Sequence, residues 1–188
     1  MHDLAPLTPL GAAVPRTDSI GTLTMTEVTD RALASLAARL GAESEAVRRA
    51  AGFIGTDLPG PGRAATEGQI GAFWTGPDQW MVDGPLDAHP DLAAELKAAV
   101  GDTASVTEQT DGWCRFTVAG PAAIALFERM CPVDISRMQP GHAARTTIDH
   151  LGVFVLCTEA GTRFDVLGPR SGAGSLHHAI CAVARALA

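Results

Sequence analysis

Two residues near the end of the chain have the types and the spacing of metal ligands. His177 and Cys181 are four residues apart, and on a helix this spacing puts both side chains on one face. Imidazole and thiolate are common zinc ligands, but zinc usually takes four ligands and this pair supplies two. Leu176 and Ile180 form an apolar stripe on the same segment. We therefore expect Cys181 at the edge of a buried helix face, with no metal bound.

A glycine-rich segment precedes this helix and has features of an anion site. It reads Gly168-Pro169-Arg170-Ser171-Gly172-Ala173-Gly174-Ser175. Free backbone amides at a helix start, together with the Arg170 guanidinium, can hold a phosphate or carboxylate. The segment lacks the lysine of a phosphate-binding loop and does not match the dinucleotide-binding fingerprint. A plain connection between a strand and a helix is the stronger prediction, and we expect no cofactor there.

A hydrolase site is the third chemical possibility, and it is incomplete. Asp149-His150 would need Cys114 or Ser136 brought close by the fold, and no Gly-x-Ser-x-Gly sequence is present. The segment from Asp149 to Gly152 is more simply a tight turn between two strands. Cys131, followed by a proline, is typical of a buried thiol at a helix end. We expect no catalytic residue in this chain.

The composition excludes several classes of function. Hydrophobic residues make up 46% of the 188 residues and charged residues 19%, which predicts a globular protein with a substantial interior. The net charge is −7 with no basic run, which argues against nucleic-acid binding. No apolar stretch approaches the roughly 18 residues of a membrane-spanning helix, and the first residues lack signal-peptide features. We expect a cytoplasmic protein, no membrane association and four reduced cysteines.

The first half of the chain predicts a mixture of strands and helices. Residues 1–18 hold three prolines without periodicity and predict an extended arm, and residues 19–28 predict a strand. From Asp30 to Gly41 the apolar residues fall at helical spacing, which predicts a helix. Further elements follow: a loop at 55–63, a hairpin of 70–75 and 79–82 turning at Gly76-Pro77-Asp78, and a helix from Pro90 to Val100.

The second half repeats this alternation. Strands at 103–110 and 113–118 are expected to pair across Asp111-Gly112, a frequent hairpin turn. A helix from Pro121, strands at 143–150, 151–158 and 163–168, and a last helix through Leu176 complete the order. The strand 151–158 is apolar on both faces and should be central in its sheet.

This order predicts an α+β fold made of two split βαβ, ferredoxin-like halves with antiparallel sheets. The arm at 1–18 would be followed by one domain at 19–188, divisible into subdomains at 19–102 and 103–188.

An ordered series of short motifs between Phe73 and Leu187 resembles one family. The series resembles the gamma subunit of heterotetrameric sarcosine oxidase, a small relative of the folate-binding aminomethyltransferase fold. At Gly172 the sequence departs from the resemblance, because an aromatic residue usually follows Arg-Ser there. The motifs are Phe73-Trp74-Thr75-Gly76-Pro77-Asp78-Gln79-Trp80, Asp111-Gly112-Trp113, Gly120-Pro121-Ala122, Cys131-Pro132-Val133-Asp134, Pro140-Gly141, Arg145-Thr146, Phe164-Asp165, and Arg170-Ser171 with Leu176 behind them.

The resemblance implies a non-catalytic structural subunit of a larger complex. In such complexes the alpha subunit binds NAD and carries a folate-binding half, the beta subunit binds FAD, FMN lies between them, and a small delta subunit holds zinc. The complex oxidises sarcosine to glycine, hydrogen peroxide and a one-carbon unit that passes to tetrahydrofolate. For this chain the resemblance implies no cofactor of its own, a main contact with the alpha subunit, and further contacts with beta and delta.

Two questions stay open from the sequence. Trp74, Trp80 and Trp113 are candidates either for the core or for a partner-facing surface. A stand-alone folate-binding or aminomethyltransferase-type protein is the alternative function. Such enzymes are about twice this length and use an acidic residue near the folate, for which Asp111 or Asp149 are candidates.

Overall fold

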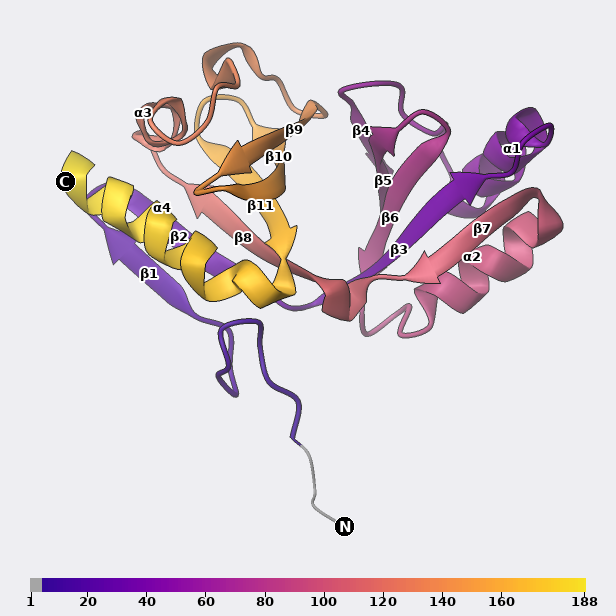
Figure 1. Cartoon of the computed structure of the whole chain (residues 1–188), viewed down its shortest axis with the longest axis horizontal. Helices are drawn as coiled ribbons and strands as arrows, with labels where there is room; N and C mark the ends of the chain where they lie inside the picture. The colour runs from indigo at the N-terminus through magenta and orange to yellow at the C-terminus, as the bar shows by residue number, and fades with distance from the viewer. Residues whose placement is uncertain (1–4) are drawn as a thin grey trace. The chain divides into compact units, whose positions relative to one another are not determined.

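The computed structural model describes residues 5–188, which form two compact units, each built on one sheet (Figure 1). The central unit comprises Asp30–Asp111 and Gly141–Ala143. The terminal unit comprises the chain up to Thr29 with Gly112–Pro140 and Ala144–Ala188. Sheets and helices occur together in both units, which confirms the predicted α+β class with antiparallel sheets.

The central unit has a five-stranded sheet in the order β4-β5-β6-β3-β7. Two helices, α1 and α2, pack on it through small and branched side chains that include Ala46, Ala50, Leu96 and Val100. The predicted hairpin at 70–82 and the helix ending at Val100 are both confirmed. The elements are β3 (Arg31–Ala38), α1 (Glu43–Ile54), β4 (Ala64–Glu67), β5 (Ile70–Gly76), β6 (Gln79–Pro85), α2 (Leu92–Val100) and β7 (Ala104–Glu108).

The helix predicted from Asp30 to Gly41 is wrong, because β3 occupies this segment as an interior strand. Its residues pair with β6 on one side and β7 on the other. Alanine and leucine favour a helix locally, but hydrogen bonds to two neighbouring strands outweigh that preference. Leu40, expected on the buried helix face, is 99% exposed in the loop that follows. The helix of this region is α1, which buries Ala46, Ala50 and Ile54 at a spacing of four residues.

The terminal unit has a six-stranded sheet in the order β1-β2-β8-β11-β10-β9. Helices α3 and α4 bury Leu126, Phe127, Leu176 and Ile180 in its core. As predicted, β10 lies between two strands and buries five consecutive residues. The elements are β1 (Thr17–Ile20), β2 (Leu23–Val28), β8 (Trp113–Ala119), α3 (Ala123–Glu128), β9 (Ala143–Ile148), β10 (Leu151–Glu159), β11 (Arg163–Pro169) and α4 (Ala173–Leu187).

The two units repeat one topology. In the central unit β3-α1-β4-β5-β6-α2 is followed by β7, which pairs with β3. In the terminal unit β8-α3-β9-β10-β11-α4 occupies the equivalent positions, and β2 from the start of the chain pairs with β8. The corresponding sheet orders are 4-5-6-3-7 and 9-10-11-8-2. The sequence therefore encodes the same arrangement twice, with the last strand of the second copy supplied by the N-terminal region.

The expected hairpin across Asp111-Gly112 is also wrong. Strands β7 and β8 belong to different sheets, and a 3-10 turn at Thr110–Gly112 joins them. Neither Asp111 nor Gly112 has the positive φ that a type I′ hairpin turn requires. The hydroxyl of Thr110 accepts a hydrogen bond from the Leu33 amide at 3.0 Å, and this bond holds the end of β7 against β3.

One buried carboxylate ties the segment before β1 to the terminal unit. Residues 5–16 of the expected arm lie outside helices and strands, and residues 1–4 lie outside the described residues. Glu27 on β2 is 2% exposed and accepts hydrogen bonds from the backbone amides of Leu10 at 2.9 Å and Arg16 at 3.1 Å. Arg170 donates a hydrogen bond to the Leu7 carbonyl at 2.6 Å. No helix within residues 5–188 has both the length and the apolar character needed to cross a membrane.

Candidate functional site

The chemically notable cluster of the terminal unit joins α4 to β1. His177 and Cys181 lie on one face of α4, as their spacing predicts, and Asp18 on β1 faces both of them. The His177 Nε2 atom lies 2.8 Å from Asp18 Oδ2 and 3.7 Å from Cys181 Sγ. The three ligand-type atoms all lie within 4.8 Å of one another. Sequence reasoning missed Asp18, which is 159 positions from His177 and joins it only through the pairing of β1 with the sheet.

Arg16 and burial set the electrostatics of this cluster. The Arg16 guanidinium binds both carboxylate oxygens of Asp18, through Nε and NH2 at 2.9 Å each. These hydrogen bonds, with a smaller contribution from His177, lower the pKa of Asp18 below its usual value. Burial raises the pKa of the Cys181 thiol, and the charge of Asp18 raises it further. In this structure the cluster therefore holds a carboxylate beside a neutral thiol.

The arrangement differs from a nucleophilic triad. In a triad the carboxylate binds one ring nitrogen of the histidine and the nucleophile faces the other nitrogen. Here both Asp18 and Cys181 face the same atom, His177 Nε2. A thiol with a raised pKa is also a poor nucleophile, because the thiolate is the reactive form. The cluster has the donor types of a metal site and lacks the geometry of a Cys-His-Asp catalytic site.

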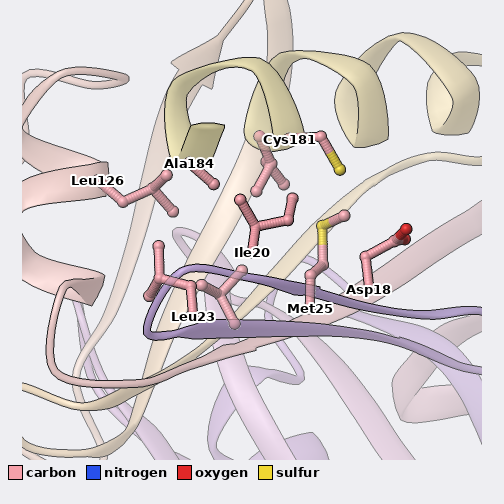
Figure 2. Close-up of a pocket in the computed structure, with 9 residues that line it drawn as sticks. Asp18, Ile20, Leu23, Met25, Leu126, Cys181 and Ala184 are labelled. Atoms are coloured by element: carbon pink, nitrogen blue, oxygen red, sulfur yellow. The ribbon is translucent and has the colours of Figure 1, made fainter. Parts of the chain in front are cut away.

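A small hollow adjoins the cluster. It is lined by residues of β1, β2, β8, α3 and α4, mostly apolar, and Asp18 and Cys181 supply its polar end. Figure 2 shows the Asp18 carboxylate and the Cys181 sulfur at the same end of this hollow. Its empty volume is about 210 Å³, part of which is open solvent, so the enclosed space is small.

The glycine-rich segment connects β11 to α4 through a 3-10 turn at Arg170–Gly172. Two of its three glycines allow close packing: a Cβ on Gly168 would lie 2.8 Å from Leu176 Cδ2, and one on Gly172 would lie 3.0 Å from the methyl carbons of Leu151. The guanidinium of Arg170, the proposed anion ligand, is engaged with the Leu7 carbonyl. The geometry of this segment is therefore explained by the contacts of the helix start and of residues 5–16.

The residues of the hydrolase hypothesis have separate partners. Asp149 and His150 form the exposed turn between β9 and β10, as predicted, with φ values of 48° and 66°. The Ser136 hydroxyl donates to Asp134 at 2.7 Å. The buried Cys114 thiol contacts the Pro169 carbonyl, and burial raises the pKa of Cys114 to about 11. Within residues 5–188 no hydrogen bond links these groups to one another, and a thiol with this pKa is not an activated nucleophile.

Comparison with known proteins places the fold. No protein-family model and no curated protein sequence matches the chain. Among solved structures, it aligns with a chain of the heterotetrameric sarcosine oxidase of Corynebacterium sp. U-96, in complex with pyrrole 2-carboxylate, at a TM-score of 0.77. The fold is that of a sarcosine oxidase chain. The identity over this alignment is 22%, and the alignment covers 86% of this chain and 83% of that one.

A second solved structure extends the likeness to the aminomethyltransferases. The glycine cleavage system aminomethyltransferase T from Bartonella henselae aligns at a TM-score of 0.65 and 14% identity. The alignment covers 88% of this chain and 47% of that enzyme, so the chain spans about half of the enzyme's length. Both comparisons confirm, at the level of fold, the resemblance found in the sequence.

The sarcosine oxidase-like fold places the three tryptophans in different settings. Trp80 is 7% exposed, and its ring nitrogen donates to the Pro59 carbonyl at 2.8 Å, so it belongs to the core of the central unit. Trp74 is half-buried, and Trp113 is half-buried with its ring 5.7 Å from the Phe154 ring. The core assignment is therefore correct for Trp80, and a partner-facing role stays a prediction for Trp74 and Trp113.

Proposed function

We propose that this chain is a gamma-type subunit of a heterotetrameric sarcosine oxidase, with a structural and non-catalytic role. The observation that carries the proposal is that the alignment with the sarcosine oxidase chain covers most of both chains. Because 86% of one chain covers 83% of the other, the two have similar lengths, and the matching chain is a small one. A match over most of both chains supports a small subunit as the counterpart of this protein, because a much larger subunit would be covered only in part.

The protonation state of the cysteine thiols supports a structural role. The four cysteines of the chain are free and buried, and burial raises the pKa of each thiol, which disfavours the nucleophilic thiolate form. In this proposal the alpha subunit is the main contact and the beta and delta subunits complete the complex. FAD, FMN, NAD, tetrahydrofolate and zinc would be held by those partners, in a cytoplasmic complex acting on sarcosine or a related N-methyl amine.

Residues 5–16 supply a surface for such a contact. Leu7 and Val14 expose 55% and 70% of their areas while the backbone of the segment is anchored through Glu27. Ordered backbone with outward apolar side chains is the arrangement expected of a segment that a partner chain covers. The proline content of the segment reduces its freedom and so lowers the entropy cost of docking.

The alternative, an independent folate-binding protein, has less support. The aminomethyltransferase that shares the fold is about twice as long as this chain. The hollow beside Asp18 is apolar except at one end and is small for a folate. Function depends on sites and not on folds, so the shared fold alone does not favour this alternative.

The test is a pull-down of the tagged full chain from its native cells, followed by mass spectrometry and absorbance spectroscopy. Recovery of two larger chains and one very small chain, with flavin absorbance, is the expected result. Recovery of the chain alone and colourless would contradict the proposal. A thermal-shift titration with tetrahydrofolate would then decide on the alternative, because binding to the folded state raises the unfolding temperature.

A further inference from the structure

Three different metal-ligand types converge in the terminal unit from two distant parts of the sequence. Asp18 lies on β1, just after residues 5–16, and His177 and Cys181 lie on α4, the last helix. The side chains of His177 and Asp18 are 12% and 18% exposed, and Cys181 is 1% exposed. The His177 ring also packs at 5.9 Å against the Phe116 ring, which limits its orientation. The cluster is therefore partly buried, and its histidine is pre-oriented.

Hydrogen bonds among Asp18, His177 and Cys181 do not satisfy all three groups, although Arg16 also donates to Asp18. His177 Nε2 faces the Asp18 carboxylate at 2.8 Å and the Cys181 sulfur at 3.7 Å. If Nε2 carries a proton, it donates to Asp18, and the Cys181 thiol faces a nitrogen that has no lone pair to accept its proton. If Nε2 carries a lone pair, it can accept from the thiol, but the lone pair then faces the carboxylate oxygen. A cation between the three atoms would satisfy all of them at once.

We propose that Asp18, His177 and Cys181 bind a divalent metal ion of the zinc type. The ligand atoms are His177 Nε2, Cys181 Sγ and one carboxylate oxygen of Asp18. A set of thiolate, imidazole and carboxylate favours zinc or cobalt over magnesium or calcium, which prefer oxygen ligands. Three protein ligands leave a fourth position, which a water molecule from the adjacent hollow would take.

Only small changes are needed for metal binding. Zinc bond lengths of about 2.0–2.3 Å in a tetrahedron put neighbouring ligand atoms roughly 3.3–3.6 Å apart. His177 Nε2 lies 2.8 Å from Asp18 and 3.7 Å from Cys181, close to this range. The Asp18 oxygen and the Cys181 sulfur lie within 4.8 Å of each other, so metal binding would draw them together by about 1 Å at most. The thiol would lose its proton to solvent as the sulfur–metal bond forms. Arg16 would release at least one oxygen of Asp18, and its side chain, 54% exposed, can turn into water.

A metal site goes beyond the proposed structural role, and it would explain how the surface formed by residues 5–16 is held in place. A metal bound by Asp18 and α4 would link the strand that follows residues 5–16 to the last helix of the chain. That link would hold the exposed apolar segment in place in the terminal unit. Because a metal binds the folded chain and the assembled ligands are absent from the unfolded chain, it would also raise the free energy of unfolding.

The test is a titration of the metal-free full chain with cobalt, followed by zinc competition. The expected result is one cobalt per chain with a thiolate-to-cobalt charge-transfer band that zinc abolishes. Cys181→Ser should abolish the band, and Asp18→Asn and His177→Gln should each weaken binding about 10–100-fold or more. The matched controls are Cys157→Ser, another buried cysteine, and His178→Gln, the exposed neighbour on α4; both should keep the band.

The Arg16→Gln variant separates a metal site from a cluster that is held only by hydrogen bonds and ion pairs, because only a metal site predicts a change in cobalt affinity. Removing the cation that occupies the Asp18 oxygens should tighten cobalt binding about fivefold. A folded wild-type chain without the band, or a band that survives Cys181→Ser, would overturn the site. Unchanged affinity in both Asp18→Asn and Arg16→Gln would overturn it as well. Near-ultraviolet circular dichroism establishes that each variant is folded. If the chain is recovered only with partner subunits, the complex is titrated instead, and the cobalt bound at this site is the difference between the wild-type complex and the Cys181→Ser complex.

Discussion

The Arg115 guanidinium lies 2.6 Å from the Asp165 carboxylate inside the terminal unit. The two residues lie on neighbouring strands, β8 and β11, and Thr117, directly opposite Asp165, donates its hydroxyl to the same carboxylate at 2.6 Å. The central unit has a related pair, Arg31 with Asp83, on the equivalent strands β3 and β6. The repeated topology of the two units therefore extends to an arginine–aspartate pair at the same strand pair of each sheet.

Removing the charge of Asp165 should destabilise the chain strongly. The side chains of Arg115 and Asp165 are 16% and 8% exposed, so Asp165→Asn leaves a largely buried guanidinium without this carboxylate. The expected loss is about 3–5 kcal/mol in the free energy of unfolding, measured by urea denaturation.

The variant Asp83→Asn should lower the free energy of unfolding less, because Arg31 is more exposed. The exposed pair of Arg48 with Glu45 is the control, and Glu45→Gln should change stability little. Equal effects in all three variants would contradict this account.

The turn between β9 and β10 can be stabilised by one substitution. His150 has a φ of 66°, a left-handed conformation that costs energy for any residue with a Cβ atom. His150→Gly should therefore raise the free energy of unfolding by about 0.5–1 kcal/mol. The matched control is His178→Gly in α4, which should lower it by roughly 0.5 kcal/mol because glycine is a poor helix former. Thermal unfolding of the two variants checks the opposite signs, and two shifts of the same sign would refute the conformational argument.

Strong local patterns predicted the fold where they agreed with tertiary pairing. The continuous apolar run in β10 predicted an interior strand, and the stripe through Leu176 and Ile180 predicted α4. The prediction failed at β3, whose alanines and leucines favour a helix, because the pairing with β6 and β7 is not visible in the local sequence. The hairpin predicted at Asp111-Gly112 failed for a related reason. These residues do form a turn, but the turn connects strands of two different sheets.

The candidate metal site shows the same limit. His177 and Cys181 were identified by their helical spacing, but the third ligand follows from sheet pairing. Asp18 reaches α4 because β1 pairs with β2 and β2 pairs with β8. No periodicity connects positions that are 159 residues apart. Long-range pairing also explains why the buried Arg115–Asp165 pair was not predicted, since each residue looks ordinary in its own strand.

Alkaline pH should destabilise the chain through Cys114. Burial raises the pKa of Cys114 to about 11 in the folded chain, whereas the unfolded thiol titrates near the ordinary value of 9.0. The folded state thus prefers the neutral thiol, and its stabilising contribution is complete below pH 9 and is lost as the pH rises toward 11. Urea unfolding between pH 8 and pH 11 should show a steeper decline in wild type than in Cys114→Ala. Parallel curves would show that another group controls the alkaline transition.

Glu27 should control the order of residues 5–16. Its buried carboxylate accepts the amides of Leu10 and Arg16, and hydrogen bonds to a charged group contribute about 1.5–3 kcal/mol. Glu27→Ala should therefore release the segment, and trypsin should cleave after Arg16 faster than in wild type. Glu108→Ala, an exposed glutamate on β7, is the control and should leave the rate of this cleavage unchanged. A rate at Arg16 that does not respond to Glu27→Ala would show that other contacts hold the segment.

The exposed apolar side chains of residues 5–16 provide a direct test of partner binding. The double variant Leu7→Asp with Val14→Asp places charge on a surface that we propose a partner chain covers, and burying an unpaired charge is costly. The tagged variant should fold as the wild type does but recover less of the larger chains and less flavin in the pull-down. The control double variant, Ser44→Asp with Thr158→Asp, adds two charges at exposed positions elsewhere and should recover the partners normally. Full recovery with the Leu7–Val14 variant would place the contact on another surface, and equal loss in both variants would point to net charge as the cause.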